Sequence, residues 1–208
     1  MASTPANTVD AAGATAGTTA GFRPLPLAPG RWAVDHAHSS LGFTIRHLGI
    51  SKVRGRFTGF DGDVVVGDSL ATTTVDATVD LASADTGNAD RDAHMLQPDM
   101  LDVERRPTMA FRSTGIRPAD ERGDDEGRWL LDGELTIGDV TRPLTLAVEL
   151  GGIEDHPMGG PRHAGFEATG EVRRSDYGIG PGFPAPVLGD VVRIDLDLQL
   201  LEPASDAG

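Results

Sequence analysis

Residues 192–200 read VRIDLDLQL, and apolar residues occupy every second position of this stretch. A period of two places alternate side chains on opposite faces of an extended strand. The stretch therefore predicts a β-strand with one apolar face and one wet face. The same pattern, or a short β-rich run, recurs at residues 41–46, 53–60, 63–66, 75–81, 109–113, 129–137, 144–150 and 166–172.

These segments are joined by turn signals such as Asp61-Gly62, and they predict an all-β fold of about eight strands. Such a pattern is typical of a single antiparallel sheet that closes into a barrel or stacks in two layers. Only residues 83–103 break the period. Asn88 can cap a helix from Ala89 to Leu96, which Gln97-Pro98 must end. We expect this short helical segment, near residues 88–103, to lie across one mouth of the barrel.

The composition excludes several function classes. The 208 residues include 32 Asp and Glu against 18 Lys and Arg, which gives a net charge of −14. This charge argues against binding to nucleic acid or to an anionic membrane surface. The absence of cysteine excludes disulfides, thiolate nucleophiles and cysteine-bound metals.

The two ends of the chain predict its domain organisation. Residues 1–30 are mostly Ala, Thr, Gly, Ser and Pro, which indicates a disordered N-terminal extension. No Lys or Arg precedes Phe22, so the extension does not have the pattern of a secretory signal, and we expect a cytoplasmic protein. No segment reaches the ~18–20 apolar residues of a membrane span. The predicted organisation is one barrel domain over residues 31–202 and a flexible tail over 203–208.

Small residues occupy many predicted inward positions. A closed sheet of about eight strands is either filled by its own side chains or holds one small ligand. Small inward residues favour the second outcome, but glycines also relieve strain in strongly coiled strands, so both interpretations stay open. The positions are Gly55, Gly59, Ala77, Gly133, Ala168 and Gly170.

Two polar residues continue apolar faces to the ends of their strands. His47 follows the register of Leu41, Phe43 and Ile45, and Arg174 follows that of residues 166–172. Such residues either form the polar rim of a cavity or reach solvent beyond the strand end. The sequence alone leaves this choice open.

Several segments, taken together, resemble the YceI-like family of lipocalin-fold, polyisoprenoid-binding proteins. They follow the order expected for that family across residues 31–201. The matching pieces are Asp35, His38-Ser39, Phe43, Ile45, Arg46-His47, Gly55-Arg56-Phe57, residues 83–91 with His94, Phe111-Arg112-Ser113, Gly133, Leu135-Thr136-Ile137 and Arg174-Ser175-Asp176-Tyr177-Gly178.

The resemblance implies an antiparallel, lipocalin-like barrel whose apolar interior takes a long isoprenoid or similar chain. It does not imply catalysis, and we expect no cofactor. It also implies that homodimers can form, and that many members carry an export signal where this chain has its polar extension. The chain departs from the family pattern at several positions. Met100 and Leu101 replace two phenylalanines, Gly138-Asp139 replaces Arg-Gly, Arg173 replaces Asn, and Tyr177 replaces Phe.

The leading functional hypothesis is that the barrel carries or sequesters a polyisoprenoid, an isoprenoid quinone or a related lipid. By resemblance, the residues along the tail of the ligand are Phe43, Ile45, Phe57, Phe111, Leu135, Leu146 and Phe166. Those near its polar head are His38, His47, Arg91, His94, Arg112 and Arg174. The structural alternative for Arg91 and Arg112 is an ion pair with one of the many aspartates, such as Asp90, Asp92 or Asp176.

Two other hypotheses place different chemistry in the same barrel. A metal site would use His36 and His38 with His47 and His94, but nine residues separate His38 from His47 and put them on opposite faces of a regular strand. An enzyme acting on a small hydrophobic substrate would use His94 as a general base beside Asp92 or Asp99. No Gly-x-Ser-x-Gly motif supports a hydrolase. We therefore expect neither metal ligands nor catalytic residues.

Overall fold

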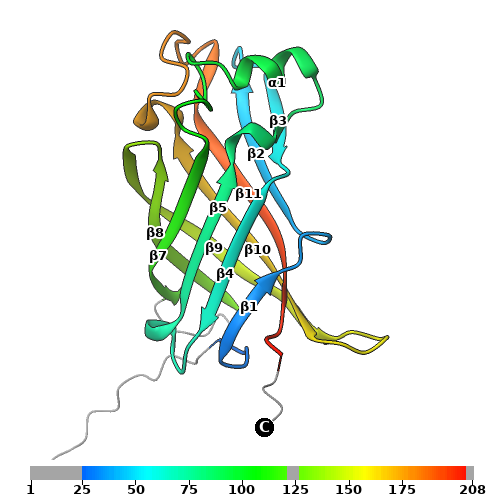
Figure 1. The fold of residues 1–208 in the computed structure, drawn as a ribbon. Coiled ribbons are helices and arrows are strands. Elements are labelled where there is room, and N and C mark those ends of the chain that lie inside the picture. The colour runs from blue at the N-terminus through cyan, green and yellow to red at the C-terminus, as the bar shows by residue number, and fades with distance from the viewer. Residues whose placement is uncertain (1–24, 121–126, 205–208) are drawn as a thin grey trace, which may run out of the picture.

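The computed structural model describes residues 25–120 and 127–204, and the strands in this part form one antiparallel sheet that curves into a barrel (Figure 1). The strands are β1 (Gly30–Val34), β2 (Ser40–His47), β3 (Ser51–Phe57), β4 (Phe60–Val66), β5 (Thr74–Asp80), β6 (Ala84–Asp85), β7 (Thr108–Pro118), β8 (Arg128–Ile137), β9 (Val140–Asp155), β10 (Arg162–Arg173) and β11 (Leu188–Leu201). The helices are α1 (Ala89–Met95) and three short 3₁₀ turns, η1 (Leu70–Thr72), η2 (Leu81–Ser83) and η3 (Arg174–Tyr177).

The long strand β11 closes the barrel. It pairs with β10 along one edge and, along the other, first with β2 and then with β1. Leu196 lies opposite Leu41 in β2, whereas Leu200 lies opposite Val34 in β1. Strands β1, β4, β5, β7, β8, β9, β10 and β11 thus form a ring of eight, which confirms the predicted closed antiparallel barrel.

The alternation read from the sequence sets the inner and outer faces of the strands. In β11, Ile194 and Leu196 point into the barrel, while Arg193 points outward and its Nε lies 3.0 Å from Glu171 Oε1 of β10. The segments with a period of two coincide with strands, except that Leu81, at the end of the segment 75–81, belongs to η2. The predicted run over residues 53–60 is divided, because β3 ends at Phe57 and β4 begins at Phe60. The sequence analysis missed β1 and β6 because five and two residues are too few to show the alternation.

Helix α1 lies at one end of the barrel, as the sequence predicted (Figure 1). The Asn88 side chain accepts a hydrogen bond from the Arg91 backbone N–H at 3.0 Å, which satisfies one of the unpaired donors of the first turn. The helix ends at Met95, before the Gln97-Pro98 pair. Among residues 25–120 and 127–204, no helix has the length and apolar character needed to cross a bilayer.

Trp32 closes the opposite end, which we call the base. Its side chain is fully buried, and its indole N–H donates to the Ala28 carbonyl at 2.9 Å. Leu25 and Leu27 pack into the same cluster, so the packed part of the chain begins inside the segment that the sequence analysis assigned to the extension over residues 1–30. The rest of that extension, residues 1–24, and residues 205–208 of the predicted tail lie outside the described residues.

Two of the inward glycines are explained by packing. A Cβ on Gly133 would collide with the Phe111 ring and lie 2.6 Å from the Arg112 carbonyl oxygen, and a Cβ on Gly55 would collide with the Phe43 ring. At these positions an aromatic ring from the neighbouring strand occupies the space that a side chain would need. The missing side chains therefore make room for phenylalanines rather than directly for a ligand.

This packing predicts that Gly133→Ala destabilises the barrel by about 1–3 kcal/mol, because the added methyl group overpacks the Phe111 site. The matched control is Gly115→Ala in β7, where a Cβ meets nothing within 4 Å and the free energy of unfolding should change by less than about 1 kcal/mol. Urea denaturation measures the free energy of unfolding of both variants. Equal effects of the two substitutions on the free energy of unfolding would contradict the packing of the Phe111 ring against Gly133.

Candidate functional site

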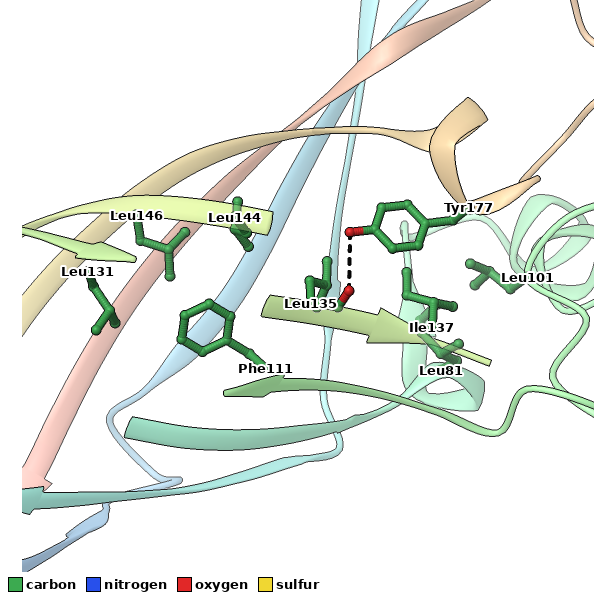
Figure 2. Packing of buried hydrophobic residues seen from close by; sticks show 10 residues of the cluster. Leu81, Leu101, Phe111, Leu131, Leu135, Ile137, Leu144, Leu146 and Tyr177 are labelled. Carbon is green, nitrogen blue, oxygen red and sulfur yellow. Dashed lines mark hydrogen bonds between the residues drawn. The ribbon is translucent and has the colours of Figure 1, made fainter. Parts of the chain in front are cut away.

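An apolar cavity of about 660 Å³ runs through the barrel between the base and the α1 end. Aliphatic and aromatic side chains from β2 to β11 form nearly all of its wall. Figure 2 shows part of this wall, in which Phe111 and Leu131 of β7 and β8 approach Leu144 and Leu146 of β9. The barrel is therefore not filled by its own side chains.

The inward residues of three strands are only half-buried. Phe43 and Ile45 of β2, Val53 of β3 and Ile194 of β11 all face the interior, yet each keeps part of its surface uncovered. In a filled protein core such side chains touch atoms on all sides. Here one side of each borders the cavity, so an apolar molecule inside would gain contacts that the protein does not itself supply.

All seven residues predicted along the tail of a ligand line this cavity; they are Phe43, Ile45, Phe57, Phe111, Leu135, Leu146 and Phe166. The Phe43 and Phe57 rings lie 5.3 Å apart between their centroids. The sequence analysis missed wall residues that belong to no regular strand: Met95, Met100, Leu101, Tyr177, Ile179, Phe183 and Val187. The sequence departs from the family pattern at Met100, Leu101 and Tyr177, and these departures were the signal that could have identified some of the missed wall residues.

Tyr177 places a hydroxyl group in this apolar wall. It is buried, and its O–H donates to the Leu135 carbonyl at 3.4 Å, as the dashed line in Figure 2 shows. Burial raises the pKa of the Tyr177 hydroxyl above its ordinary value. The hydroxyl group therefore stays neutral at neutral pH, in keeping with its apolar surroundings.

Four of the predicted polar residues meet at the α1 end of the cavity, and we call them the rim: His47, Arg91, His94 and Arg174. His47 is the last residue of β2, and its side chain has no hydrogen-bond partner within residues 25–120 and 127–204. Arg91 binds Thr86, through Nε to Oγ1 at 2.6 Å and through Nη2 to the carbonyl at 3.0 Å. The alternative of an Arg91 ion pair with Asp90 or Asp92 is therefore not observed.

His94 lies beside a carboxylate, as the enzymatic hypothesis requires. Its Nε2 lies 3.2 Å from Asp99 Oδ2, and its ring packs edge-on against Phe183, with 5.9 Å between the ring centroids. Both partners of the His94–Asp99 pair are about half exposed, and Asp99 does not line the cavity. In the described part of the chain, no group of three or more His, Asp or Glu side chains is arranged to hold a metal ion.

Arg174 is buried, with 6% of its surface exposed, and all five of its N–H donors bind backbone carbonyls. Its partners are the carbonyl oxygens of Ile179, Gly180, Phe183, Leu188 and Gly189, at 2.5 to 3.0 Å. Arg174 thus fixes the loop over residues 178–187 to the first residues of β11, and this loop forms one side of the rim. Arg174 brings a positive charge to the cavity but has no donor left for a ligand.

The structure places two of the predicted head-group residues away from the cavity. Arg112 follows Phe111 in β7, so it points outward, and its Nε lies 3.1 Å from Asp76. This is the structural ion pair that the sequence analysis named as the alternative, with a different aspartate. His38 lies in the turn before β2, 2.8 Å from Asp35. That hydrogen bond is the main reason that the pKa of the Asp35 carboxyl lies below its ordinary value.

Comparisons with known proteins agree with this architecture. Residues 32–200 match the family model for the YceI-like domain. A UPF0312 protein of Vibrio vulnificus is 35% identical over 165 residues, which cover 79% of this chain and 81% of that protein.

Two solved structures share the fold. Burkholderia cenocepacia BcnA has a TM-score of 0.68 at 22% identity and covers 80% of this chain and 98% of its own. A polyisoprenoid binding domain from Saccharophagus degradans has a TM-score of 0.59 at 17% identity and covers 83% of this chain and 98% of its own.

Fold and cavity define a closed, lipocalin-like antiparallel β-barrel with an apolar interior. The chain belongs to the YceI-like family, which confirms the resemblance seen in the sequence.

The hydrogen bonds of Arg174 predict that Arg174→Lys lowers the free energy of unfolding by about 3 kcal/mol. Lysine has three donors, so at least two of the five carbonyls lose their partner, and each costs about 1–3 kcal/mol when buried. The control, Arg112→Lys on the outer face, should change it by less than about 0.5 kcal/mol. Urea unfolding measures both, and an undisturbed Arg174→Lys protein would contradict the fixing role of Arg174.

Proposed function

We propose that this protein binds a long-chain hydrophobic ligand in the barrel and carries or sequesters it, without acting on it as an enzyme. The ligand class is a polyisoprenoid, an isoprenoid quinone or a related lipid. The observation that carries the proposal is the apolar cavity with its half-buried wall. The description of the Saccharophagus degradans neighbour as a polyisoprenoid binding domain supports the ligand class.

The cavity favours an extended apolar chain for energetic reasons. Burial of apolar surface contributes about 25 cal/mol per Å², and a chain inside the barrel would be covered on all sides. The wall offers few polar groups along its length, so a polar molecule of the same size would lose its hydrogen bonds to water. The affinity would therefore come from the tail.

The polar head of the ligand would lie at the rim. Among the described residues, none forms a hydrogen bond with the His47 imidazole, and Thr86 alone engages the Arg91 guanidinium group. Either group can donate to a phosphate, a hydroxyl or a quinone oxygen. Arg174 would contribute its charge but no hydrogen bond, because its donors are all engaged.

Transport, homodimer formation and the cytoplasmic location remain predictions.

The cavity predicts that Ala77→Phe weakens the binding of geranylgeraniol at least about ten-fold, because the added ring occupies space that the chain requires. Ala77 points inward from β5, whereas Ala110, which lies opposite Thr78 on β7, points outward and is exposed. Ala110→Phe is therefore the matched control and should leave the affinity within about two-fold. Isothermal titration calorimetry measures the affinity of both variants for geranylgeraniol, after bound lipid has been extracted from the protein.

Native mass spectrometry of the freshly purified protein, followed by organic extraction, gives an independent check. A prenyl compound or other lipid bound at about one per chain is the expected result. If Ala77→Phe and Ala110→Phe bind geranylgeraniol as the unaltered chain does, the ligand does not occupy the cavity and the proposed function is wrong.

The rim predicts a head-group effect. Arg91→Met should weaken binding of geranylgeranyl phosphate about ten-fold more than binding of geranylgeraniol, because a hydrogen bond to a charged group contributes about 1.5–3 kcal/mol. Arg112→Met, which removes an outward-facing arginine, should leave the ratio of the two affinities unchanged. Equal losses for both ligands after Arg91→Met would rule out Arg91 as a head-group ligand.

A further inference from the structure

Exposed apolar side chains gather at the α1 end of the barrel. The described part of the chain leaves four large apolar side chains exposed, and three of them lie here: Leu48 (51%), Ile50 (84%) and Val187 (37%). Leu48 and Ile50 form the turn between β2 and β3, and the Leu48 N–H donates to the Val187 carbonyl at 2.9 Å. We call these three residues the apolar tip. The fourth, Met158, lies in the turn between β9 and β10, at the base end.

The backbone of this turn does not favour leucine. Leu48 and Gly49 both have positive φ, 53° and 70°, and the Ile50 N–H donates to the His47 carbonyl at 3.2 Å. Positive φ at both central residues is typical of a type I′ turn, for which Asn and Gly are the favoured residues. The chain therefore keeps a large apolar side chain where both the backbone and the contact with water oppose it. Such a position indicates a role outside the fold itself.

Cations flank the apolar tip on the outer face of the barrel. Arg46 of β2 lies directly opposite Lys52 of β3, and Arg54 follows two residues later; we call these three the cation patch. Like charges opposite each other destabilise a sheet. Within residues 25–120 and 127–204, no carboxylate forms an ion pair with any of the three, although most other exposed arginines have such a partner.

The apolar tip and the cation patch lie beside the α1 end of the cavity. His47, the residue before Leu48, is part of the rim, and Val187 itself lines the cavity. Asp190 at this end pairs with Arg173, and Asp99 lies beside His94, whereas Asp90 and Asp92 belong to α1. The charges on the strands that carry the apolar tip are those of the cation patch.

We propose that this end of the barrel docks on an anionic lipid bilayer. Leu48, Ile50 and Val187 would enter the interfacial region, and the cation patch would bind lipid phosphates. Apolar side chains next to basic ones are the combination that binds such surfaces, and each Lys or Arg near an anionic surface adds to the attraction. A second copy of the chain fits less well, because the patch would face its own positive charge across a two-fold axis.

Docking places the rim against the membrane, so a hydrophobic ligand passes between the bilayer and the cavity without crossing water. This exchange role rests on the proposed function, whereas docking itself does not. The surface is suited to reversible contact, because three exposed apolar side chains bury far less area than a membrane-spanning segment.

The test is flotation of the full chain with vesicles of phosphatidylcholine alone or mixed with phosphatidylglycerol. The unaltered protein should float with the mixed vesicles, and added salt should weaken the binding. Leu48→Ser with Ile50→Ser should reduce binding about ten-fold, and Met158→Ser, which removes the exposed methionine at the base, should not.

The contribution of the cation patch is tested with two double variants that have the same net charge as each other. Arg46→Gln with Lys52→Gln should reduce binding to mixed vesicles about 25-fold, since each cation contributes about a five-fold factor. Arg112→Gln with Arg117→Gln removes the same charge from the paired outer-face arginines and should leave binding within about two-fold.

Three results would overturn the docking proposal: no preference for the mixed vesicles, unchanged binding by the apolar-tip and cation-patch variants, or conversion of a dimer to a monomer by those variants in sedimentation velocity. The last result would make the turn a contact between copies. Geranylgeraniol titration of the unaltered protein separates the two proposals. If the unaltered protein floats with the mixed vesicles but does not bind geranylgeraniol, the proposed function alone is contradicted. If it binds geranylgeraniol but does not float, docking alone is contradicted.

Discussion

The pairing of β11 with two different partners along one edge is the constraint on which the structure depends. Because β2 takes the first part of that edge and β1 the last residues, the sheet returns to its own start and the ring closes. Closure removes the free edges of the ring strands and turns one face of every strand inward. The period of two then makes the interior apolar, and the ring of eight is wider than its inward side chains can fill.

The two ends of this ring are built differently, and that asymmetry gives the cavity a direction. At the base, Trp32 and its neighbours form a packed apolar plug. At the other end, the wall consists of α1 and the loop over residues 178–187, which polar groups hold in place. Arg174 binds three carbonyls of this loop and two at the start of β11, and Arg106 joins Met100 to Tyr177 through their carbonyls at 2.8 and 2.9 Å. The His and Arg side chains that line the cavity therefore all lie at the α1 end.

The sequence predicted the barrel and its inner wall because both follow from one local pattern. Phe43 and Ile45 were placed correctly since a strand residue can face only two ways. The same alternation puts Arg112 outside, next to the inward Phe111, and here the family resemblance had overridden the register. Arg174 lies in the predicted inward register, but its partners come from a loop whose path no local pattern reveals. The tip residues Leu48 and Ile50 escaped notice because an apolar turn residue is recognised only once its exposure is known.

The net charge of −14 had argued against an anionic membrane, and the cation patch shows why that argument is incomplete. At physiological ionic strength, charges interact strongly only over about 8 Å, so a surface responds to the charges that face it rather than to the sum over the molecule. Acidic residues elsewhere on the barrel are screened from a surface that the β2–β3 turn touches. They also oppose every other orientation, so the net negative charge favours approach by the α1 end.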